Sequence, residues 1–131
     1  MSIPIGLKGE ASAPVTQAST AASMGSGTLP VFATPAMAAL MEQAAYTSLL
    51  PCLEPGQGSV GTALTLTHLS ATPVGLTVRA ESEVTQVDGR TVTFRVAAYD
   101  QAGLIGQCTH QRVIIQEDRF LAKAERKKEE N

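Results

Sequence analysis

The sequence predicts an α+β fold in which an antiparallel sheet of about five strands wraps around one long central helix. The stretch from residue 35 to residue 50, PAMAALMEQAAYTSLL, is apolar on nearly every side and has the length of a helix. From residue 60 to residue 115, apolar and polar residues alternate in runs separated by turn signals, which is typical of half-buried antiparallel strands. A single apolar helix followed by such strands is best buried when the sheet curls around it.

The N-terminal part is expected to form an initial strand, followed by a loop. Residues 16–28, TQASTAASMGSGT, are rich in Ser, Thr, Ala and Gly and lack a persistent apolar period. We therefore interpret residues 16–28 as a flexible loop before the helix. Such a loop either acts as a lid or is a plain disordered connection, and its composition favours the connection.

The helix has clear start and stop signals. Thr34 can cap free backbone N–H groups, and Pro35 suits the first helical position, so the helix should begin there. It should end near Pro51, which cannot continue it, and the EPGQGS run at 54–59 then supplies a turn.

Four strands should follow the helix. In the first, Leu64, Leu66 and His68 share one side of the strand, so His68 lies on the apolar side. A second alternating run follows Gly75, and Asp88-Gly89 then indicates a hairpin with a type I′ turn, which needs residues that accept positive φ. The last run, 104–115, alternates less cleanly and suggests a bulge near Gly106. The residues expected to face inward on the two hairpin strands are Leu76, Val78, Ala80, Val84, Val92, Phe94, Val96 and Ala98.

One helix inside a curled antiparallel sheet is the arrangement of the hot-dog fold. A chain of 131 residues fits a single hot-dog domain spanning 1–131. Residues 117–131 carry five acidic and five basic side chains, so this charged C-terminal tail is expected to be a surface helix. One protomer usually leaves a sheet edge and part of the helix uncovered, so we expect a homodimer, with a tetramer left open.

Composition excludes several classes of protein. A net charge of −2, with 44% hydrophobic residues, fits a globular protein without affinity for nucleic acid. No segment has the pattern of a secretory signal or a membrane span, so we expect a cytoplasmic protein with no membrane partner. Cys52 and Cys108 stand alone and are most simply reduced thiols, although a bond between them is not excluded. Two histidines 42 positions apart make no metal-ligand motif, so no metal is expected.

Glu42 is the one ionisable carboxylate in the apolar stretch. A buried carboxylate must be paired or hydrogen-bonded, or its pKa rises toward neutrality, and both outcomes are useful in an active site. The alternative is that Glu42 lies on a narrow solvated stripe beside Gln43 and Tyr46. The pattern leaves both interpretations open.

Thr34, Glu42 and His68 are the candidate catalytic residues. A hydroxyl, a carboxylate and an imidazole together can support acyl transfer, with a base activating water or a nucleophile. The helix N-terminus also suits an oxyanion, because its N–H groups carry positive partial charge. Each residue has a structural alternative, as a helix cap, a solvated helix residue and a hydrogen-bonded core histidine respectively. Gly61 would let a group approach the backbone closely, or it marks a strand bend.

Three segments resemble the fluoroacetyl-CoA thioesterase-like group of hot-dog proteins. They are VFATPAMAALMEQA at 31–44, LEPGQGSVGTALTLTHLSATPVGLTV at 53–78 and IGQCTHQRVII at 105–115, with order and spacing preserved. The resemblance implies a catalytic set that falls on Thr34, Glu42 and His68, and a site at a dimer interface. It further implies that Gly61 lies near the reacting carbonyl and that Arg112 lies close to the pocket or its partner subunit.

We therefore expect an acyl-CoA thioesterase that hydrolyses a small acyl-CoA to free acid and CoA. No cofactor is expected, since CoA is part of the substrate. The fluoroacetyl-specific enzyme has aromatic residues in the loop before this motif, whereas residues 25–30 here read GSGTLP, so selectivity for a fluorinated substrate is not expected. The alternatives are a non-catalytic acyl-CoA binding or sensing module and, with less support, an enoyl-CoA hydratase. Whether Glu42 attacks the thioester or activates water is left open by the sequence.

Overall fold

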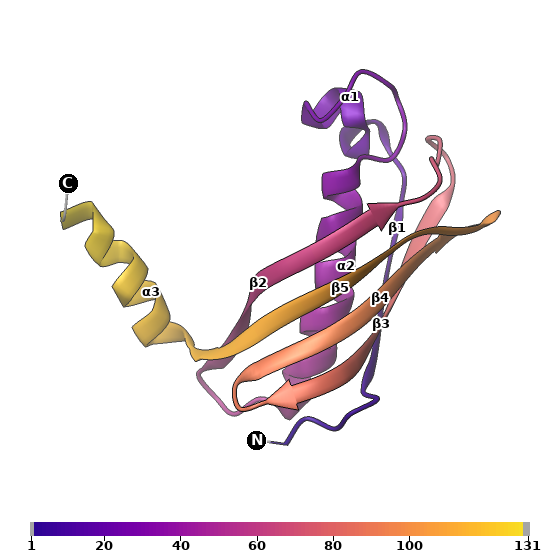
Figure 1. Cartoon of the computed structure of the whole chain (residues 1–131). Helices are drawn as coiled ribbons and strands as arrows, with labels where there is room; N and C mark the ends of the chain where they lie inside the picture. The colour runs from indigo at the N-terminus through magenta and orange to yellow at the C-terminus, as the bar shows by residue number, and fades with distance from the viewer. Residues whose placement is uncertain (1, 130–131) are drawn as a thin grey trace.

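The computed structural model describes residues 2–129, which form one curled sheet with a long helix against it (Figure 1). Three short 3-10 turns, at Gln17–Ser19, Leu50–Cys52 and Arg126–Glu129, supplement the main elements. The strands are β1 (Lys8–Pro14), β2 (Gln57–His68), β3 (Thr77–Asp88), β4 (Thr91–Asp100) and β5 (Gly103–Gln116), and the helices are α1 (Ala21–Met24), α2 (Thr34–Leu49) and α3 (Glu117–Glu125).

All neighbouring strands of the sheet are antiparallel, and their order is β1-β3-β4-β5-β2. The predicted fold class is therefore confirmed: five strands curl around one helix. The initial strand, β1, lies at one edge of the sheet, and β2, the first strand after the helix, lies at the other. An edge strand has backbone groups without a partner in the sheet, and β1 and β2 are the edge strands here.

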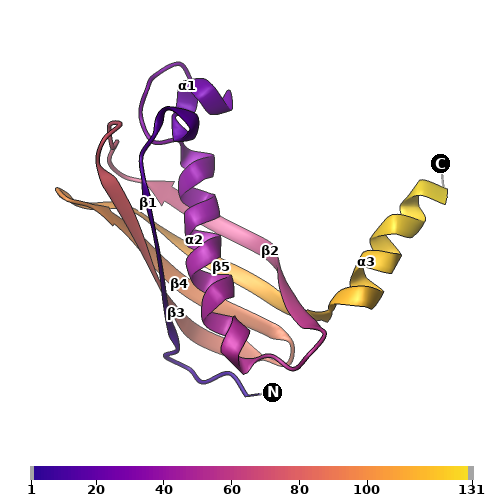
Figure 2. The same cartoon turned by 180° about the vertical axis from the view of Figure 1, so that it is seen from behind.

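The core lies between α2 and the inner face of the sheet (Figure 2). Six α2 residues are buried there: Met37, Leu40, Met41, Ala44, Ala45 and Leu49. The inward-facing residues predicted for β3 and β4 are buried as well, among them Val78, Ala80, Val84, Val92, Phe94, Val96 and Ala98. Alternation on the strands therefore identified the core correctly, since side chains of period two face one side of a sheet.

A glycine sets how closely β1 approaches α2. A Cβ atom at Gly9 would overlap the carbonyl oxygen of Ala44 and would come within 2.7 Å of Ser48 Cβ and Ser82 Oγ. Only glycine allows this spacing, because the nearest obstacle is helix backbone rather than a side chain that could move.

Residues 16–28, expected to form a loop, contain two short helical turns. They contain the 3-10 turn Gln17–Ser19 and the one-turn helix α1, in which the Thr20 hydroxyl accepts a hydrogen bond from the Ser23 N–H. The backbone N–H of Ala21 donates to Val31 O over 2.8 Å, and Thr20 is fully buried. Short Thr and Ser side chains cap these two turns through local hydrogen bonds. The spacing of apolar residues in the sequence does not reveal such bonds.

The hairpin between β3 and β4 forms at the predicted place but with a different turn. Gly89 has φ +60°, and none of the described non-glycine residues has a positive φ, so Arg90 cannot take the second position of a type I′ turn. Glycine followed by a residue of negative φ is the pattern of a type II′ turn. The bulge expected near Gly106 is present: Ala98 pairs with Gly106 and Tyr99 with Leu104, which leaves Ile105 as the extra residue.

The tail beyond β5 forms helix α3 and a final 3-10 turn, while residues 130–131 of the predicted tail lie outside the described part. Figures 1 and 2 show α3 extending away from the sheet, and none of its residues is buried. Among residues 2–129, no helix has both the length and the apolar character needed to cross a membrane.

Candidate active site

Thr34 and His68 meet at the start of α2. Thr34 is the first residue of the helix, His68 is the last residue of β2, and the Thr34 Oγ1 and His68 Nδ1 atoms lie 2.8 Å apart in a hydrogen bond. The N-cap is Ala33, whose side chain makes no capping bond. The expected role of Thr34 as the cap is therefore wrong, because its hydroxyl is engaged by an imidazole from another element.

The second ring nitrogen of His68, Nε2, is buried and lacks a hydrogen-bond partner among the described residues. Buried polar atoms of this kind usually find a partner, so an unpaired one needs an explanation. The pair lines a hollow of about 350 Å³ together with Val31, Phe32, Leu69 and other residues of the 69–71 turn. The N–H groups of the first turn of α2 open at the same end of the helix and lack intrahelical acceptors.

Glu42 lies further along α2 and is bound by Arg112. Its side chain is 42% exposed in the single chain, whereas the side chain of Arg112 is 8% exposed. Arg112 Nη1 donates to Glu42 Oε2 over 3.1 Å. Gln43 and Tyr46 beside it are exposed, so within one chain the solvated-stripe interpretation describes Glu42 better than full burial does.

Arg112 is fixed from several sides. Its Nε donates to Ser59 Oγ over 2.8 Å and its Nη2 donates to Ser59 O over 3.0 Å. The guanidinium carbon lies 5.8 Å from the centre of the Tyr46 ring. Burial lowers the pKa of Arg112, while the charge of Glu42 and the hydrogen bond to it act in the opposite direction. A guanidinium held this firmly presents Glu42 in a defined position.

His110 completes this group and was not identified from the sequence. It is 1% exposed, its Nδ1 lies 2.8 Å from Ala63 O, and its Nε2 lies 3.2 Å from Arg112 Nη1. A carbonyl only accepts, so Nδ1 carries the proton and Nε2 accepts from the guanidinium. Burial lowers the pKa of His110 and the charge of Arg112 acts in the same direction, while the bond to Ala63 and the charge of Glu42 oppose them. An imidazole that donates through Nδ1 and accepts through Nε2 is the neutral form. The spacing of two residues between His110 and Arg112 on β5 places both on the inner face, and this alternation was the available signal.

Gly61 leaves room for the carboxylate. A Cβ at this position would overlap Glu42 Oε2 and would lie 3.2 Å from His110 Cε1. The register of β2 against β5 also shifts between Gly61 and Ala63. Both sequence interpretations of Gly61 therefore apply: it marks an irregularity in the strand and it allows a close approach.

The structure thus brings the five candidates together as two groups. Thr34 and His68 form one, while Glu42, Arg112 and Gly61 form the other. No hydrogen bond or ion pair between residues 2–129 joins them. Glu42 lies eight positions after Thr34 on the helix, which corresponds to about 12 Å along the axis. One chain therefore carries two separate groups of candidate residues.

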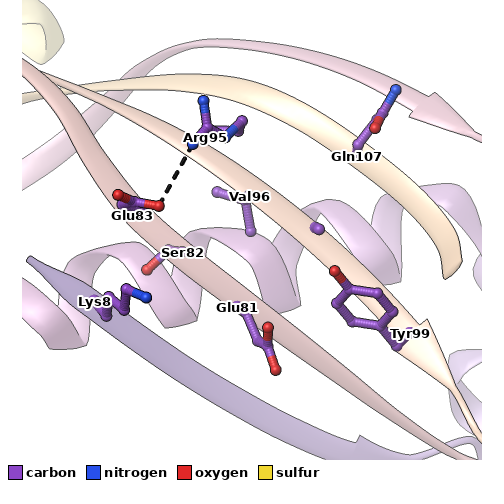
Figure 3. A pocket seen from close by; sticks show the side chains of 9 residues that line it. Lys8, Glu81, Ser82, Glu83, Arg95, Val96, Tyr99 and Gln107 are labelled. Atoms are coloured by element: carbon purple, nitrogen blue, oxygen red, sulfur yellow. Dashed lines mark hydrogen bonds and ion pairs between the residues drawn. The ribbon is translucent and has the colours of Figure 1, made fainter. Parts of the chain in front are cut away.

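A further hollow on the outer face of the sheet, of about 200 Å³, contains none of these residues. It lies over β3 and β4, where Arg95 Nη2 and Glu83 Oε1 form an exposed ion pair at 3.5 Å (Figure 3). Exposed pairs of this kind contribute little free energy. The two groups of residues on and beside α2 remain the candidate active site.

A sheet curled around a helix, with a hydroxyl–imidazole pair beside the helix start and a carboxylate two turns later, defines a hot-dog protein of the thioesterase class. The chain belongs to the family of fluoroacetyl-CoA-specific thioesterases, whose model matches residues 15–118. The resemblance of the three sequence segments to this family is therefore confirmed.

Individual relatives agree with this assignment. The fluoroacetyl-CoA thioesterase of Streptantibioticus cattleyicolor is 47% identical over 97 residues, which make up 74% of this chain and 70% of that protein. The structure of a Thr→Ser variant of a fluoroacetyl-CoA-specific thioesterase with acetyl-CoA is 37% identical, with a TM-score of 0.91 over 95% of this chain and 98% of that one. A hypothetical protein of Thermus thermophilus, a thioesterase superfamily member, is 32% identical, with a TM-score of 0.91 over 98% and 96% of the chains.

Proposed function

We propose that this protein hydrolyses a small acyl-CoA thioester to the free acid and CoA, with Glu42, His68 and Thr34 as the catalytic residues. The observation that carries the proposal is the accessible carboxylate of Glu42, fixed by Arg112, on the same helix that begins with the Thr34–His68 pair. A carboxylate held in place and left open to solvent can meet both water and a thioester.

Two routes fit these residues. In the first, Glu42 removes a proton from water while the water oxygen adds to the thioester carbonyl; the C–S bond then breaks and the CoA thiolate takes up a proton. In the second, Glu42 attacks the carbonyl directly, CoA leaves, and water hydrolyses the acyl–Glu42 anhydride. In both, His68 exchanges the proton with the leaving sulfur, and Thr34 orients the imidazole or binds the intermediate.

We propose that the working site of a homodimer combines the Thr34–His68 group of one chain with the Glu42–Arg112 group of the other. Each group is then one half-site. The edge strand β2 is free in the single chain, and antiparallel pairing of two β2 strands would extend the sheet across a two-fold axis. Such a pairing would bring Glu42 of one protomer toward Thr34 and His68 of the other. The unpartnered His68 Nε2 supports a site that only a second chain completes. A tetramer built from two such dimers is compatible with the same site.

The acyl group is proposed to be small and not specifically fluorinated. Residues 25–30, GSGTLP, contain no aromatic side chain, and Met24 and Leu29 are the exposed apolar residues that remain to cover the site. The proposed chemistry needs no metal or separate cofactor. Cys52 and Cys108 are both free thiols, which supports a reducing compartment such as the cytoplasm.

The test is free-thiol release from short, branched, aromatic and fluorinated acyl-CoAs, with wild type and Glu42→Gln compared in parallel. Glutamine keeps the size of the side chain and removes its charge, so turnover should fall by orders of magnitude. Gln43→Ala, at the exposed neighbouring position, should behave as wild type. Equal rates for wild type and Glu42→Gln would reject the role of Glu42, and CoA binding without turnover in the wild type would reject the enzyme.

A further inference from the structure

Helix α3 projects from the body of the protein with its apolar side chains uncovered. Phe120 is 45% exposed and Leu121 is 61% exposed, and α3 has no buried residue. Its contacts with its own chain lie near its first residues. The Glu117 N–H donates to Gly56 O over 2.9 Å, and Phe120 and Arg119 line a hollow with Ile115 and Arg90. Both views show α3 running away from the sheet (Figures 1 and 2).

A helix of this length is not stable by itself. α3 spans nine residues, and isolated helices shorter than about 12–15 residues are marginal in water. Helices in proteins are stabilised mainly by packing an apolar face, and here that face is largely unpacked. The chain therefore lacks a surface that α3 needs.

The direction of α3 indicates which molecule supplies that surface. Gln57, the first residue of β2, pairs with Gln116, the residue immediately before α3, so the helix departs beside the free edge of the sheet. In both figures α3 leaves on the β2 side, away from β1. A second copy that pairs along β2 would occupy the space into which α3 extends.

We propose that α3 is an arm that docks on a second copy of this chain, against its exposed Leu69, Val74 and Leu104. The inference rests on the proposed function, because it uses the dimer that joins the two half-sites. These three side chains are 52%, 45% and 43% exposed. They lie at the end of the sheet opposite to α3, and the Leu69 N–H donates to Ile105 O over 2.7 Å, which places Leu69 next to Leu104.

The register follows from joining the half-sites. Antiparallel pairing that sets Gly61 of one copy opposite His68 of the other directs the start of β2, at Gln57, toward the segment that follows His68 in the second copy. The start of α3 then falls beside the 69–74 segment of the second copy. Phe120 and Leu121 meet exposed apolar side chains there, and burial of apolar surface on both sides stabilises the dimer.

The arm also bears on the catalytic pocket. Leu69 lines the hollow that contains Thr34 and His68. An α3 helix packed on Leu69 of the second copy therefore forms an outer wall of that copy's pocket. Each protomer would close the half-site of the other.

The test is disulfide cross-linking in a Cys52→Ser background. We expect Leu69→Cys combined with Leu121→Cys to give a covalent dimer on mild oxidation. Ile5→Cys combined with Leu121→Cys is the matched control, because Ile5 is 63% exposed but lies beside β3 at the other edge of the sheet, where Gly6 N–H donates to Val84 O. The control should stay monomeric on a non-reducing gel. Equal cross-linking of both pairs, or none of Leu69→Cys/Leu121→Cys, would overturn the arm.

A second measurement separates the arm from the enzyme. Leu121→Glu should raise the dissociation constant of the dimer at least tenfold in sedimentation experiments, while Lys123→Gln on the same helix should leave it unchanged. An unaltered dimer in Leu121→Glu would overturn the arm even if acyl-CoA is hydrolysed normally. Conversely, cross-linking of Leu69→Cys/Leu121→Cys together with a wild-type protein that hydrolyses no acyl-CoA would support the arm and reject the proposed function.

Discussion

His110 Nε2 lies 3.2 Å from Arg112 Nη1, the same nitrogen that binds Glu42. The opposite side of the ring bonds to Ala63 O in the edge strand β2, so His110 connects the strand to the guanidinium. Arg112 therefore cannot rotate without breaking a buried hydrogen bond. This neutral histidine fixes the position of the Glu42 carboxylate indirectly, through Arg112. His110 Nε2 itself lies 3.8 Å from Glu42 Oε2.

We expect His110→Phe to weaken both stability and turnover. The variant keeps an aromatic ring beside Phe94, whose centre lies 6.0 Å from that of His110, but it removes a partner from Ala63 and from Arg112. An unpaired buried polar group costs about 1–3 kcal/mol, so the free energy of unfolding should fall by that amount. The value of kcat should fall about tenfold, which corresponds to about 1.4 kcal/mol.

Denaturant unfolding and thiol release measure the two effects of His110→Phe. Gln111→Ala is the control, because Gln111 is the exposed neighbour on β5. A folded His110→Phe protein with the kcat of wild type would show that His110 does not position the carboxylate.

The stability of the protein should decrease as the pH falls below about 6.5. Burial lowers the pKa of His110 from its ordinary value of 6.5, so the unfolded chain binds a proton at a pH where the native chain does not. The native state is then disfavoured as pH falls, and the contribution of His110 is fully present only above the unfolded pKa. The melting temperature of wild type should therefore fall toward that of His110→Phe between pH 8 and pH 5. A difference between the two that stays constant over this range would contradict the assignment.

The sequence predicted the elements well because their signals are local. Alternation identified the buried residues of β3 and β4. Pro35 lies in the first turn of the helix Thr34–Leu49, and Pro51 follows its end. The type of the hairpin turn was predicted wrongly. Asp88-Gly89 marks the position of the hairpin, but the φ of Arg90 decides the turn type. The residues 17–24 are held by Thr and Ser side chains bonding to nearby backbone, which hydrophobic periodicity does not detect.

The candidate site was only partly predictable, because its contacts join residues that are distant in the chain. The sequence predicts a capping role for the hydroxyl of Thr34, because the imidazole of His68 that binds it is 34 positions away in the chain. Nothing in the sequence distinguishes His110 from an ordinary core residue. Only the structure shows that its two ring nitrogens bond to Ala63 and Arg112. The resemblance to a known family supplied the role of Arg112, which charge and spacing alone did not indicate.

Gly61→Ala should reduce turnover with little loss of stability. The new Cβ would overlap Glu42 Oε2 and would move a side chain that is 42% exposed and free to rotate away. The carboxylate would then leave Arg112, and we expect kcat to fall at least tenfold while the melting temperature changes by only a few degrees. Gly58→Ala is the matched control on β2, because its Cβ meets the end of the Glu117 side chain instead. Equal activities of the two variants would mean that the position of Glu42 does not control the rate.

Cys52 should react with thiol reagents far faster than Cys108 in the folded protein. Burial raises the pKa of the Cys108 thiol to about 11, with a smaller contribution from the charge of Glu42, whereas Cys52 is partly exposed. The thiolate is the reactive form, so at pH 7.5 almost none of Cys108 is reactive and its side chain is also shielded from the reagent. Mass spectrometry after brief treatment with iodoacetamide should find one label, on Cys52, and two labels after unfolding in guanidinium. A second label on the folded protein at the same rate would mean that Cys108 is reached from solvent, and that the inner face of β5 opens on the timescale of the reaction.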